Sequence, residues 1–562
     1  MEPIEKQVSR RTMRKRMRAG VVVAWVTPAI LVGVPVAAGV DQSSAADVTA
    51  RVSRPATIHQ AEGTGGAGSS LSTGVAPGPL VPDPQAYARA KADADVRAGV
   101  ATSPPPSAGP SPAGPTTIRS WKGIKDITSA PSDSTGAIGT TRYVELVNRK
   151  FAIYDRTNNI PISKGSLASL VGGAGNVFDP QVVWDPGTSR FYAVADDVVS
   201  ATTDNRLAVA FSTTASPNSA ADWCKYFFGY GSEFPDYPKL GDTADFWMAG
   251  VNVFSGSTHA FIRTDLAWIT KPPSGTTCPP ASSFGAGTVT SLTNADSSVA
   301  WTPVPANQTD TNSSGHVVAT RFPGTGSASF ISVFDVTNSG GSLSLGAPRT
   351  MSVAAYSVPA SAPQPGTSFK LDTLDTRLTQ AVSAIDPFRG GVAIWTQHTA
   401  FGGAGAQVRW YEINPTPATP VPFQSGTETD GSLFLFNAAI SPDRRVNGAS
   451  TMFGSALALG FNRSSSAQAT QFVIATKLDN AAISAPTVFV TSSAPVDDFS
   501  CGLPPRPPDV CRWGDYAAAT PDPAASTAAA RGQVWLTNAR SKDSTGSFAD
   551  WRTWNAAVLP SP

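Results

Sequence analysis

The 562-residue sequence predicts an all-β protein whose main domain is a β-propeller. From Trp121 onward, short runs rich in β-branched and aromatic residues alternate with turns of Gly, Pro, Asn, Asp and Ser. A polar or proline-containing entry followed by an apolar strand recurs along this stretch at steps of about 60 residues. Repeats of that length suit four-stranded propeller blades with long loops.

The repeats begin near residues 141, 178, 237, 317, 377, 436 and 515. The clearest copy is Phe178–Pro186, and the copy near 317 places His316 on an inner strand. Seven starts favour seven blades, with six as the alternative because the first interval is short. We expect the C-terminal strands at 533–537 and 552–558 to close the ring beside the first blade, which would remove exposed sheet edges.

Residues 1–40 are typical of an export segment. A basic stretch precedes Ala19–Val40, which carries no charge. Ser9–Lys15 resembles the twin-arginine export motif, although Arg14 stands where an apolar residue is expected, so general export remains the alternative. The uncharged run is either part of a cleaved signal peptide or a membrane anchor long enough to span a bilayer. Either way we expect the rest of the chain outside the cytoplasm, secreted or anchored, with no other membrane link.

Residues 41–120 are rich in Ala, Gly, Ser, Thr and Pro, and we expect a disordered linker there. Within it, Pro84–Gly99 has the composition of a short helix that would be marginal alone, because it has almost no apolar face. The chain thus divides into an export segment (1–40), a linker (41–120) and a propeller domain (121–562).

Overall composition excludes one class of function. Charged residues make up only 15% of the chain, and 42 basic against 41 acidic residues leave a net charge of +1. Bulk charge therefore does not favour a nucleic-acid partner.

The four cysteines, Cys224, Cys278, Cys501 and Cys511, form an even set that predicts disulfides in an exported chain. Of the three pairings, Cys501 with Cys511 is the obvious one, because these two bracket a proline-rich loop, and it leaves Cys224 with Cys278. The sequence contains no Cys-x-x-Cys and no closely spaced His pair, so we expect no metal and no cofactor.

Two stretches resemble the Asp box of sialidase-like propellers, Ser-x-Asp-x-Gly-x-x-Trp. They are Ser216–Trp223 and Asn294–Trp301, and each lacks part of the motif. The domain from Trp121 also resembles a group of secreted bacterial propellers of unassigned activity, through FDPQVVWDPGTSRFYAV, DYPKLG, LDTRL, VRWYEI and RWGDY. This resemblance implies the fold and no known reaction. A sialidase needs a Tyr–Glu nucleophile pair, but Tyr411 and Glu412 are adjacent and point to opposite faces of a strand.

The axial mouth of the ring is the candidate ligand site, because the ends of the innermost strands gather there. The charged residues expected at this mouth are Asp179, Asp236, Lys239, Asp375, Arg377, Arg512 and Asp515. Mixed charge in a concave site suits a polar extracellular glycan, peptide or cell-wall component, bound by a monomeric protein.

Two other interpretations remain open, so the sequence does not decide whether the protein is an enzyme. The carboxylates of Asp179, Asp236, Asp375 and Asp515 could serve a glycoside hydrolase or lyase as paired acids. Alternatively, the charged residues pair with one another and tie the blades together.

Overall fold

The computed structural model describes residues 51–61, 74–75, 80–100, 112–272, 277–310, 314–443, 454–502, 509–524, 531–541 and 549–561. Contacts divide the chain into Met1–Asp47 and Val48–Pro562, and all described residues belong to the second unit. The export segment predicted at 1–40 lies outside them. Strands account for 53% of the structure and helices for 6%, which confirms the all-β prediction. Within the described ranges, no helix has the length and apolar character needed to cross a membrane.

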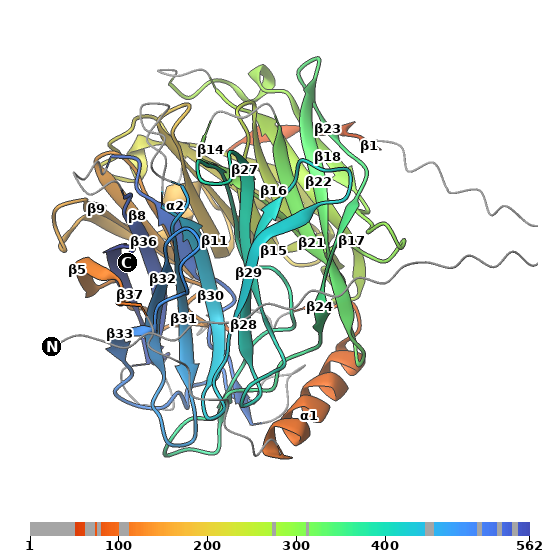
Figure 1. Cartoon of the computed structure of the whole chain (residues 1–562). Coiled ribbons are helices and arrows are strands. Elements are labelled where there is room, and N and C mark those ends of the chain that lie inside the picture. Colours follow the sequence, from red (N-terminus) through yellow and green to blue (C-terminus); the bar gives the residue numbers. More distant parts are fainter. Residues whose placement is uncertain are drawn as a thin grey trace, which may run out of the picture. The chain divides into compact units, whose positions relative to one another are not determined.

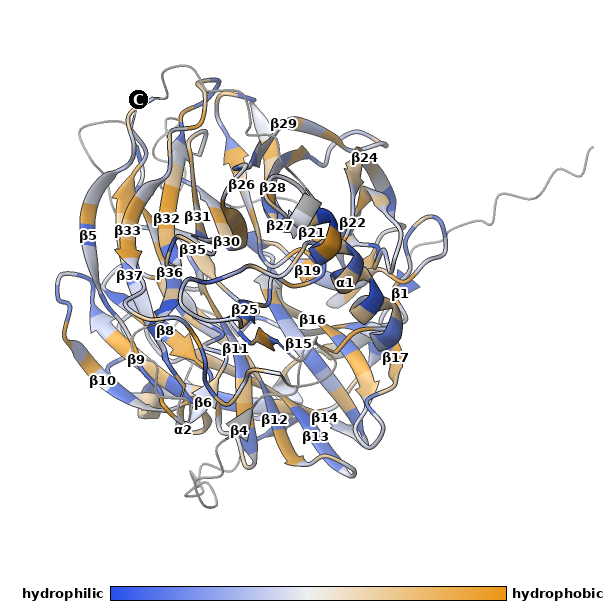
Figure 2. Cartoon of the chain, turned by 90° about the horizontal axis from the view of Figure 1, so that it is seen from below, coloured by the Kyte–Doolittle hydropathy of each residue, from blue (hydrophilic) through white to orange (hydrophobic). Residues whose placement is uncertain are grey.

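The strands form antiparallel meanders in a β-propeller arrangement, in which five blades are recognised. In Figure 2, β11, β15 and β30 lie around the middle, and strands such as β10, β13 and β29 lie further out. The strands of the first half are β7 (Thr135–Ile138), β8 (Arg142–Val147), β9 (Lys150–Asp155) and β10 (Pro161–Ser166); β11 (Asn176–Asp185), β12 (Arg190–Ser200), β13 (Asp204–Ser212) and β14 (Trp223–Gly231); β15 (Glu233–Asp242), β16 (Phe246–Ser255), β17 (Phe261–Thr270) and β18 (Ala286–Thr290).

The meanders continue in the same way through the second half of the chain (Figure 1). Their strands are β19 (Trp301–Pro305), β21 (Gly315–Thr320), β22 (Ala328–Ser339), β23 (Ser342–Leu345) and β24 (Arg349–Tyr356); β26 (Ala381–Asp386), β27 (Gly391–Ala400), β28 (Gln407–Asn414) and β29 (Val421–Glu428); β30 (Phe434–Pro442), β31 (Leu457–Ser464), β32 (Gln471–Lys477) and β33 (Thr487–Thr491); β35 (Ala518–Pro521), β36 (Val534–Ser541) and β37 (Trp551–Leu559). β20 (Asn307–Gln308) pairs in parallel with β15 and β26 and joins their meanders into one ten-stranded sheet.

Two of the predicted repeat starts are second strands and not inner ones. The start near 141 falls at β8, after the inner strand β7, and the start near 317 falls in β21, after β19. The prediction that His316 lies on an inner strand is therefore wrong. The inner strand β19 has the sequence Trp-Thr-Pro-Val-Pro, and its two prolines hide the strand pattern.

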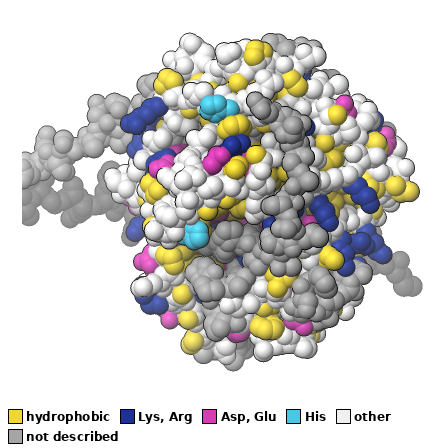
Figure 3. All heavy atoms as spheres, turned by 180° about the vertical axis from the view of Figure 1, so that it is seen from behind, with side chains coloured by type: hydrophobic (Ala, Val, Ile, Leu, Met, Phe, Trp, Pro, Cys, Tyr) yellow, Lys and Arg dark blue, Asp and Glu magenta, His cyan; other side chains and the backbone are white. Residues whose placement is uncertain are grey.

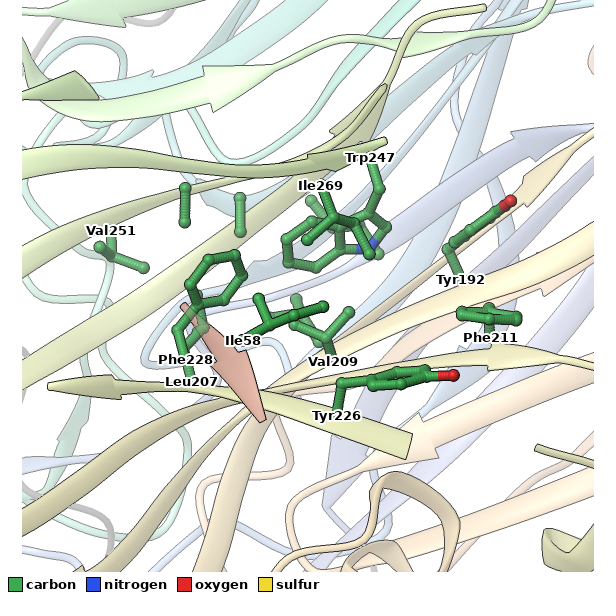
Figure 4. Close-up of a cluster of buried hydrophobic side chains, with 14 of the residues drawn as sticks. Ile58, Tyr192, Leu207, Val209, Phe211, Tyr226, Phe228, Trp247, Val251 and Ile269 are labelled. Carbon is green, nitrogen blue, oxygen red and sulfur yellow. The ribbon is translucent and has the colours of Figure 1, made fainter. Parts of the chain in front are cut away.

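Apolar clusters between neighbouring sheets hold the ring together. Figure 4 shows one of them, where Val209 and Phe211 of β13 face Trp247 of β16 and Ile269 of β17. A similar cluster joins the last meander to the first through Trp535 of β36 and Tyr143 of β8. Side chains packed closely between two neighbouring sheets bury an apolar face of each sheet.

The ring closes through a strand that precedes it in the sequence. β5 (Thr116–Lys122) pairs antiparallel with β37 and so becomes the outermost strand of the C-terminal meander. The expected role of the C-terminal strands in closure is thus confirmed, with β5 as the partner.

Much of the expected linker is ordered, which corrects the prediction of a disordered arm over 41–120. The short strands β1 (Arg51–Val52), β2 (Arg54–Pro55) and β3 (Ile58–Gln60) pair with the outer strands β23, β18 and β14, respectively. Segment 51–60 therefore ties together three successive meanders. β4 (Gly74–Val75) likewise pairs in parallel with β6 (Ser129–Ala130).

The predicted short helix is present as α1 (Pro84–Val100). Asp83 caps it by accepting from the Ala86 backbone N–H (2.8 Å), and Pro84 occupies the first helical position, where its missing N–H costs nothing. The helix has little apolar character of its own, but it buries Tyr87 and Lys91 against the propeller. Tertiary contact, not propensity, stabilises it.

Both predicted disulfides are formed, and the structure describes no free cysteine. Cys224 on β14 joins Cys278, which follows β17 in the next meander, across 54 residues of chain. Cys501 joins Cys511 across 10 residues, beside β25 (Lys370–Leu371) and β34 (Val510–Cys511).

Loop length predicts which disulfide contributes more to stability. Replacing Cys224 and Cys278 together by Ala should lower the free energy of unfolding by about 4 kcal/mol, and replacing Cys501 and Cys511 by about 3 kcal/mol, because the longer loop loses more chain entropy when closed. Urea unfolding of both double variants measures the order. A larger loss for the short loop would contradict this account.

Candidate functional site

Several inner strands contain the same backbone irregularity. Their pairing with the next strand shifts register at a β-bulge, and one residue in each bulge has a positive φ. These residues are Asp179 (53°), Tyr237 (62°), Thr302 (50°) and Asn437 (50°). Such angles are unusual for tyrosine and threonine, so tertiary contacts must hold them. A bulge also re-aims neighbouring side chains, which here brings residues of different meanders into contact.

The preceding meander supplies an acceptor for the backbone N–H of two of these bulge residues. The Asp179 N–H donates to Asn148 Oδ1 (2.8 Å), and the Thr302 N–H donates to Asn252 Oδ1 (3.1 Å). At the third bulge the Tyr237 amide opposes the rise of the pKa of Asp196, on the second strand β12, but neither Asp196 oxygen has a regular hydrogen bond among the described residues. Buried amides need a partner, so this contact links consecutive sheets near the axis.

Asp196 lies beside two of the predicted site residues, Asp179 and Asp236. One carboxylate oxygen of each lies within 4.8 Å of the others, and all three side chains are buried. Burial raises the pKa of Asp179 to about 7, helped by Asp236, and burial raises the pKa of Asp236 to about 7, opposed by Arg377. Burial and then Asp179 raise the pKa of Asp196 well above its usual range. Because burial disfavours the charged form, protonated carboxyl groups are well populated in this trio at neutral pH.

Lys239 lies between two tyrosine rings in the same cluster. Its Nζ is 3.6 Å from the ring centre of Tyr237 and 3.5 Å from that of Tyr516. The Tyr516 hydroxyl donates to Asp179 Oδ2 (3.2 Å), and the Tyr237 hydroxyl donates to the Asp515 backbone oxygen (2.6 Å). Burial, and then the charge of Arg377, lower the pKa of Lys239 far below its usual value. The two rings thus fix a lysine whose charge is strongly disfavoured.

Arg377 and Asp375 form a buried bidentate ion pair. Nε and Nη2 of Arg377 each donate to an Asp375 oxygen at 2.8 Å, and neither residue is more than 1% exposed. The Trp301 indole N–H donates to the same carboxylate (3.1 Å). His398, whose pKa burial lowers to about 4, contacts the Thr376 carbonyl through Nδ1 at 2.8 Å and so supports the turn between the pair.

Arg512 and Asp515 form a second buried ion pair. The Asp515 backbone N–H donates to Asp133 Oδ1 (2.7 Å), which connects this pair to the segment before β7. Burial, and then Asp515 and Asp179, raise the pKa of Asp133 well above its usual value. Bidentate or short charge-assisted contacts of this kind are the strongest hydrogen bonds in proteins.

The structure brings all seven predicted site residues into one buried group, called the axial cluster below. Its members are Asp179, Asp236, Lys239, Asp375, Arg377, Arg512 and Asp515, together with Asp133, Asp196, Tyr237 and Tyr516. Sequence reasoning missed the last four, because it looked for charges at the starts of inner strands. Asp196 lies on a second strand, and the misplaced first repeat hid Asp133.

The chain itself covers the axial cluster. The Arg377 guanidinium donates to the Leu80 backbone oxygen (3.4 Å), and Leu80 and Val81 pack in one apolar group with Trp301. Lys91 of α1 donates to Thr373 Oγ1 (2.8 Å) and lies 3.4 Å from Asp372. Segment 80–100 is therefore anchored over the residues that lead into the Asp375–Arg377 turn.

Asp179, Asp196 and Asp236 are also placed so that, among the described residues, their carboxylates could hold a cation. Three convergent carboxylate oxygens are typical ligands of Ca²⁺ or Mg²⁺. Protons can bind to the same oxygens in place of a cation. Burial raises the pKa of all three carboxyl groups and so favours the protonated forms. The sequence, which predicted no metal, gave no sign of this trio because Asp196 is not part of any spaced motif.

The raised pKa values predict a pH dependence of stability. Between about pH 4 and pH 7, folded Asp179 and Asp236 bind protons that the unfolded chain, with an ordinary pKa of 3.8, has lost. The free energy of unfolding should therefore fall as the pH rises through this range. Asp196→Asn keeps the shape of the side chain and removes one carboxylate, so it should raise stability at pH 7 and flatten the slope.

Urea unfolding at several pH values checks this prediction. Asp204→Asn is the matched control, because its hydrogen bond to Arg206 lowers the pKa of Asp204 and should give a contribution of opposite sign. A variant Asp196→Asn that is less stable than the wild type at pH 7 would show that its charge is needed.

Neither a family model nor a curated protein matches the chain. Solved structures that it resembles include a mutant of Synechocystis apocarotenoid oxygenase, at 8% identity over 63% of this chain and 72% of that one, with a TM-score of 0.34. The hemagglutinin-neuraminidase of parainfluenza virus 5 with the ligand DANA has 8% identity over 70% and 96% of the two chains and a TM-score of 0.32. Trypanosoma rangeli sialidase in complex with sialic acid has 9% identity over 79% and 59%, with a TM-score of 0.36. At these scores the likenesses say nothing about activity, and the fold rests on the strand pairing itself.

Proposed function

We propose that the protein is an exported β-propeller that binds a polar extracellular ligand, a glycan, peptide or cell-wall component, at the axial cluster. The main support for this proposal is three buried polar atoms that have no hydrogen-bond partner in the described part of the chain: Lys239 Nζ, Asp179 Oδ1 and Arg377 Nη1. Each such atom costs about 1–3 kcal/mol if it stays unpaired. A ligand with several hydroxyl or amide groups would pair them.

The position of Asp236 supports entry at this end of the ring. With 7% of its surface exposed, it is the most accessible of the seven predicted residues. Leu80 and Val81 lie over the neighbouring Arg377 side. Binding of anything larger than a single polar group would therefore require residues 80–81 to move aside.

Hydrolysis of a glycan is the second candidate function. Retaining glycosidases place two carboxyl groups about 5–5.5 Å apart and need one of them protonated. Asp179 and Asp236 have oxygens within 4.8 Å of each other, and burial raises the pKa of each to about 7. This is the carboxylate pair in the axial cluster that such chemistry would use, with the protonated member as general acid.

Asp236→Asn tests the proposal with little risk to the fold, since it keeps the shape of the side chain. We expect the purified full chain to retain components of a glycan array or purified peptidoglycan, and Asp236→Asn to weaken that retention at least about tenfold, because an amide replaces the carboxyl group that would bind the ligand's hydroxyl or amide groups. Asp245→Asn, at an exposed position in the turn before β16, is the matched control and should bind as the wild type does.

Three outcomes decide the matter. Equal retention by wild type and Asp236→Asn would place binding elsewhere, and no retention of any glycan, peptide or peptidoglycan by the wild type would end the proposal. Release of shortened glycans by the wild type, lost in Asp179→Asn, would establish hydrolysis in place of binding alone.

We further propose that residues 1–40 export the chain, which remains a monomer either secreted or anchored with the propeller outside. The basic stretch before an uncharged run supports export. Cell fractionation should find the propeller outside the cytoplasmic membrane, whereas full-length chain in the soluble cytoplasm would contradict it.

We also propose that the ring has seven blades. The meanders that begin at β7, β11, β15, β19, β26, β30 and β35 support this number. Apolar clusters between each neighbouring pair, including the last and the first, support a closed ring of that size.

A further inference from the structure

A second site lies on the outer part of the closure seam, away from the axial cluster. A cavity of about 530 Å³ opens between the outer strands β9 and β10 of one sheet and β5 and β37 of another. Its charged lining residues are Lys122, Lys125, Lys150, Lys164 and Arg552, and it has no Asp or Glu in its lining. Five cations around one cavity contrast with a chain whose net charge is only +1.

These cations are only partly neutralised by the protein. Lys150 forms an ion pair with the buried Asp126 (3.2 Å). In the described part of the chain, Lys122 and Lys164 are exposed and have no ion pair, and Arg552 Nε is buried without a hydrogen-bond partner. Like charges gathered around a cavity repel one another, and a bound anion would relieve this. Figure 3 shows Lys and Arg side chains gathered toward the edge that carries β5 and β9 in Figure 1.

Two glycines maintain the shape of this cavity. A Cβ at Gly165 would lie 2.7 Å from the ring of Phe151, and a Cβ at Gly123 would lie 2.3 Å from Glu145 Oε1. Neither distance is tolerated without a shift, so both positions require glycine for close packing. Lys122, the last residue of β5, and Lys125 lie on either side of Gly123 in the lining.

Exposed isoleucines flank the same cations. Ile118 lies on β5 with Lys122, and Ile162 lies on β10 with Lys164; each isoleucine is the unpaired residue at a β-bulge of its edge strand. The exposed fractions are 41% for Ile118 and 45% for Ile162, and 73% for the neighbouring Ile160. Exposed apolar side chains beside a cationic cavity form an amphipathic surface, which a purely polar anion would not need.

We propose that this surface binds an anionic lipid membrane, with the cavity taking the phosphate of a lipid headgroup and the isoleucines entering the interface. Charge complementarity favours an anionic headgroup, and the apolar rim favours a lipid over a soluble phosphate or an acidic polysaccharide. The site is independent of the axial cluster and of the proposed ligand there. It would hold the propeller on its side against a membrane, whether or not residues 1–40 are retained.

Cosedimentation of the full chain with vesicles tests this. The probes are vesicles of phosphatidylcholine alone and of phosphatidylcholine with 30 mol% phosphatidylglycerol. Lys122→Gln with Lys164→Gln should weaken binding to the anionic vesicles at least about tenfold, since each cation near an anionic surface contributes separately. Ile160→Ser with Ile162→Ser should weaken it as well. Higher salt should weaken wild-type binding and have less effect on the lysine variant.

Arg54→Gln with Arg89→Gln is the matched control, because it removes two exposed cations of other regions and should bind as the wild type does. All variants share residues 1–40, so any binding through that segment is common to them and cancels in the comparison. Equal binding by the lysine variant and the wild type would overturn the proposal. So would capture of inorganic phosphate or an acidic polysaccharide without vesicle binding. Retention of glycans or peptidoglycan at the axial cluster should be unaffected, so the two proposals fail separately.

Discussion

The backbone N–H of the left-handed bulge residues is the constraint on which the centre of this ring depends. A buried amide needs an acceptor, and for Asp179 and Thr302 the acceptor lies on, or directly after, the second strand of the preceding meander. Where that acceptor is an asparagine, the contact is neutral. Beside the Tyr237 bulge the corresponding side chain is Asp196, a carboxylate close to those of Asp179 and Asp236. One carboxylate of the axial cluster thus lies where asparagines lie beside two other bulges.

Ion pairs within short turns explain why charged residues near the axis tolerate burial. Arg377 forms an ion pair with Asp375 on one short turn, and Arg512 forms one with Asp515 on another. Pairs so close in sequence need little chain ordering to meet, and they leave the neighbouring sheets free to pack through apolar contacts. Removing one member of a buried pair would leave an unpaired charge, which is far more costly than removing both.

The sequence was informative where a pattern repeats and misleading where proline or a bulge interrupts it. The β class, the two disulfides and the span of α1 could be predicted from composition, cysteine number and a proline-led helical segment. The positions of two inner strands could not, because Trp301–Pro305 carries two prolines and the strand before Arg142 is only four residues long. The charges of the site were visible, yet their partners were not: Asp196 and Asp133 meet the others only through the geometry of the ring. The cationic cavity is likewise assembled from strands at both ends of the domain.

The pairing of β5 with β37 has a consequence for how the molecule forms. Ser120 and Trp554, which are hydrogen-bonded across this pair, are 434 positions apart in the chain. Contacts between neighbouring meanders are far more local and can develop early, whereas the seam waits for the last strand to be synthesised. Until then Trp121 and Tyr143 lack their contacts with Trp535, and the nascent ring is an open arc with two exposed sheet edges. Completion of the chain and protection of these edges are therefore the same event.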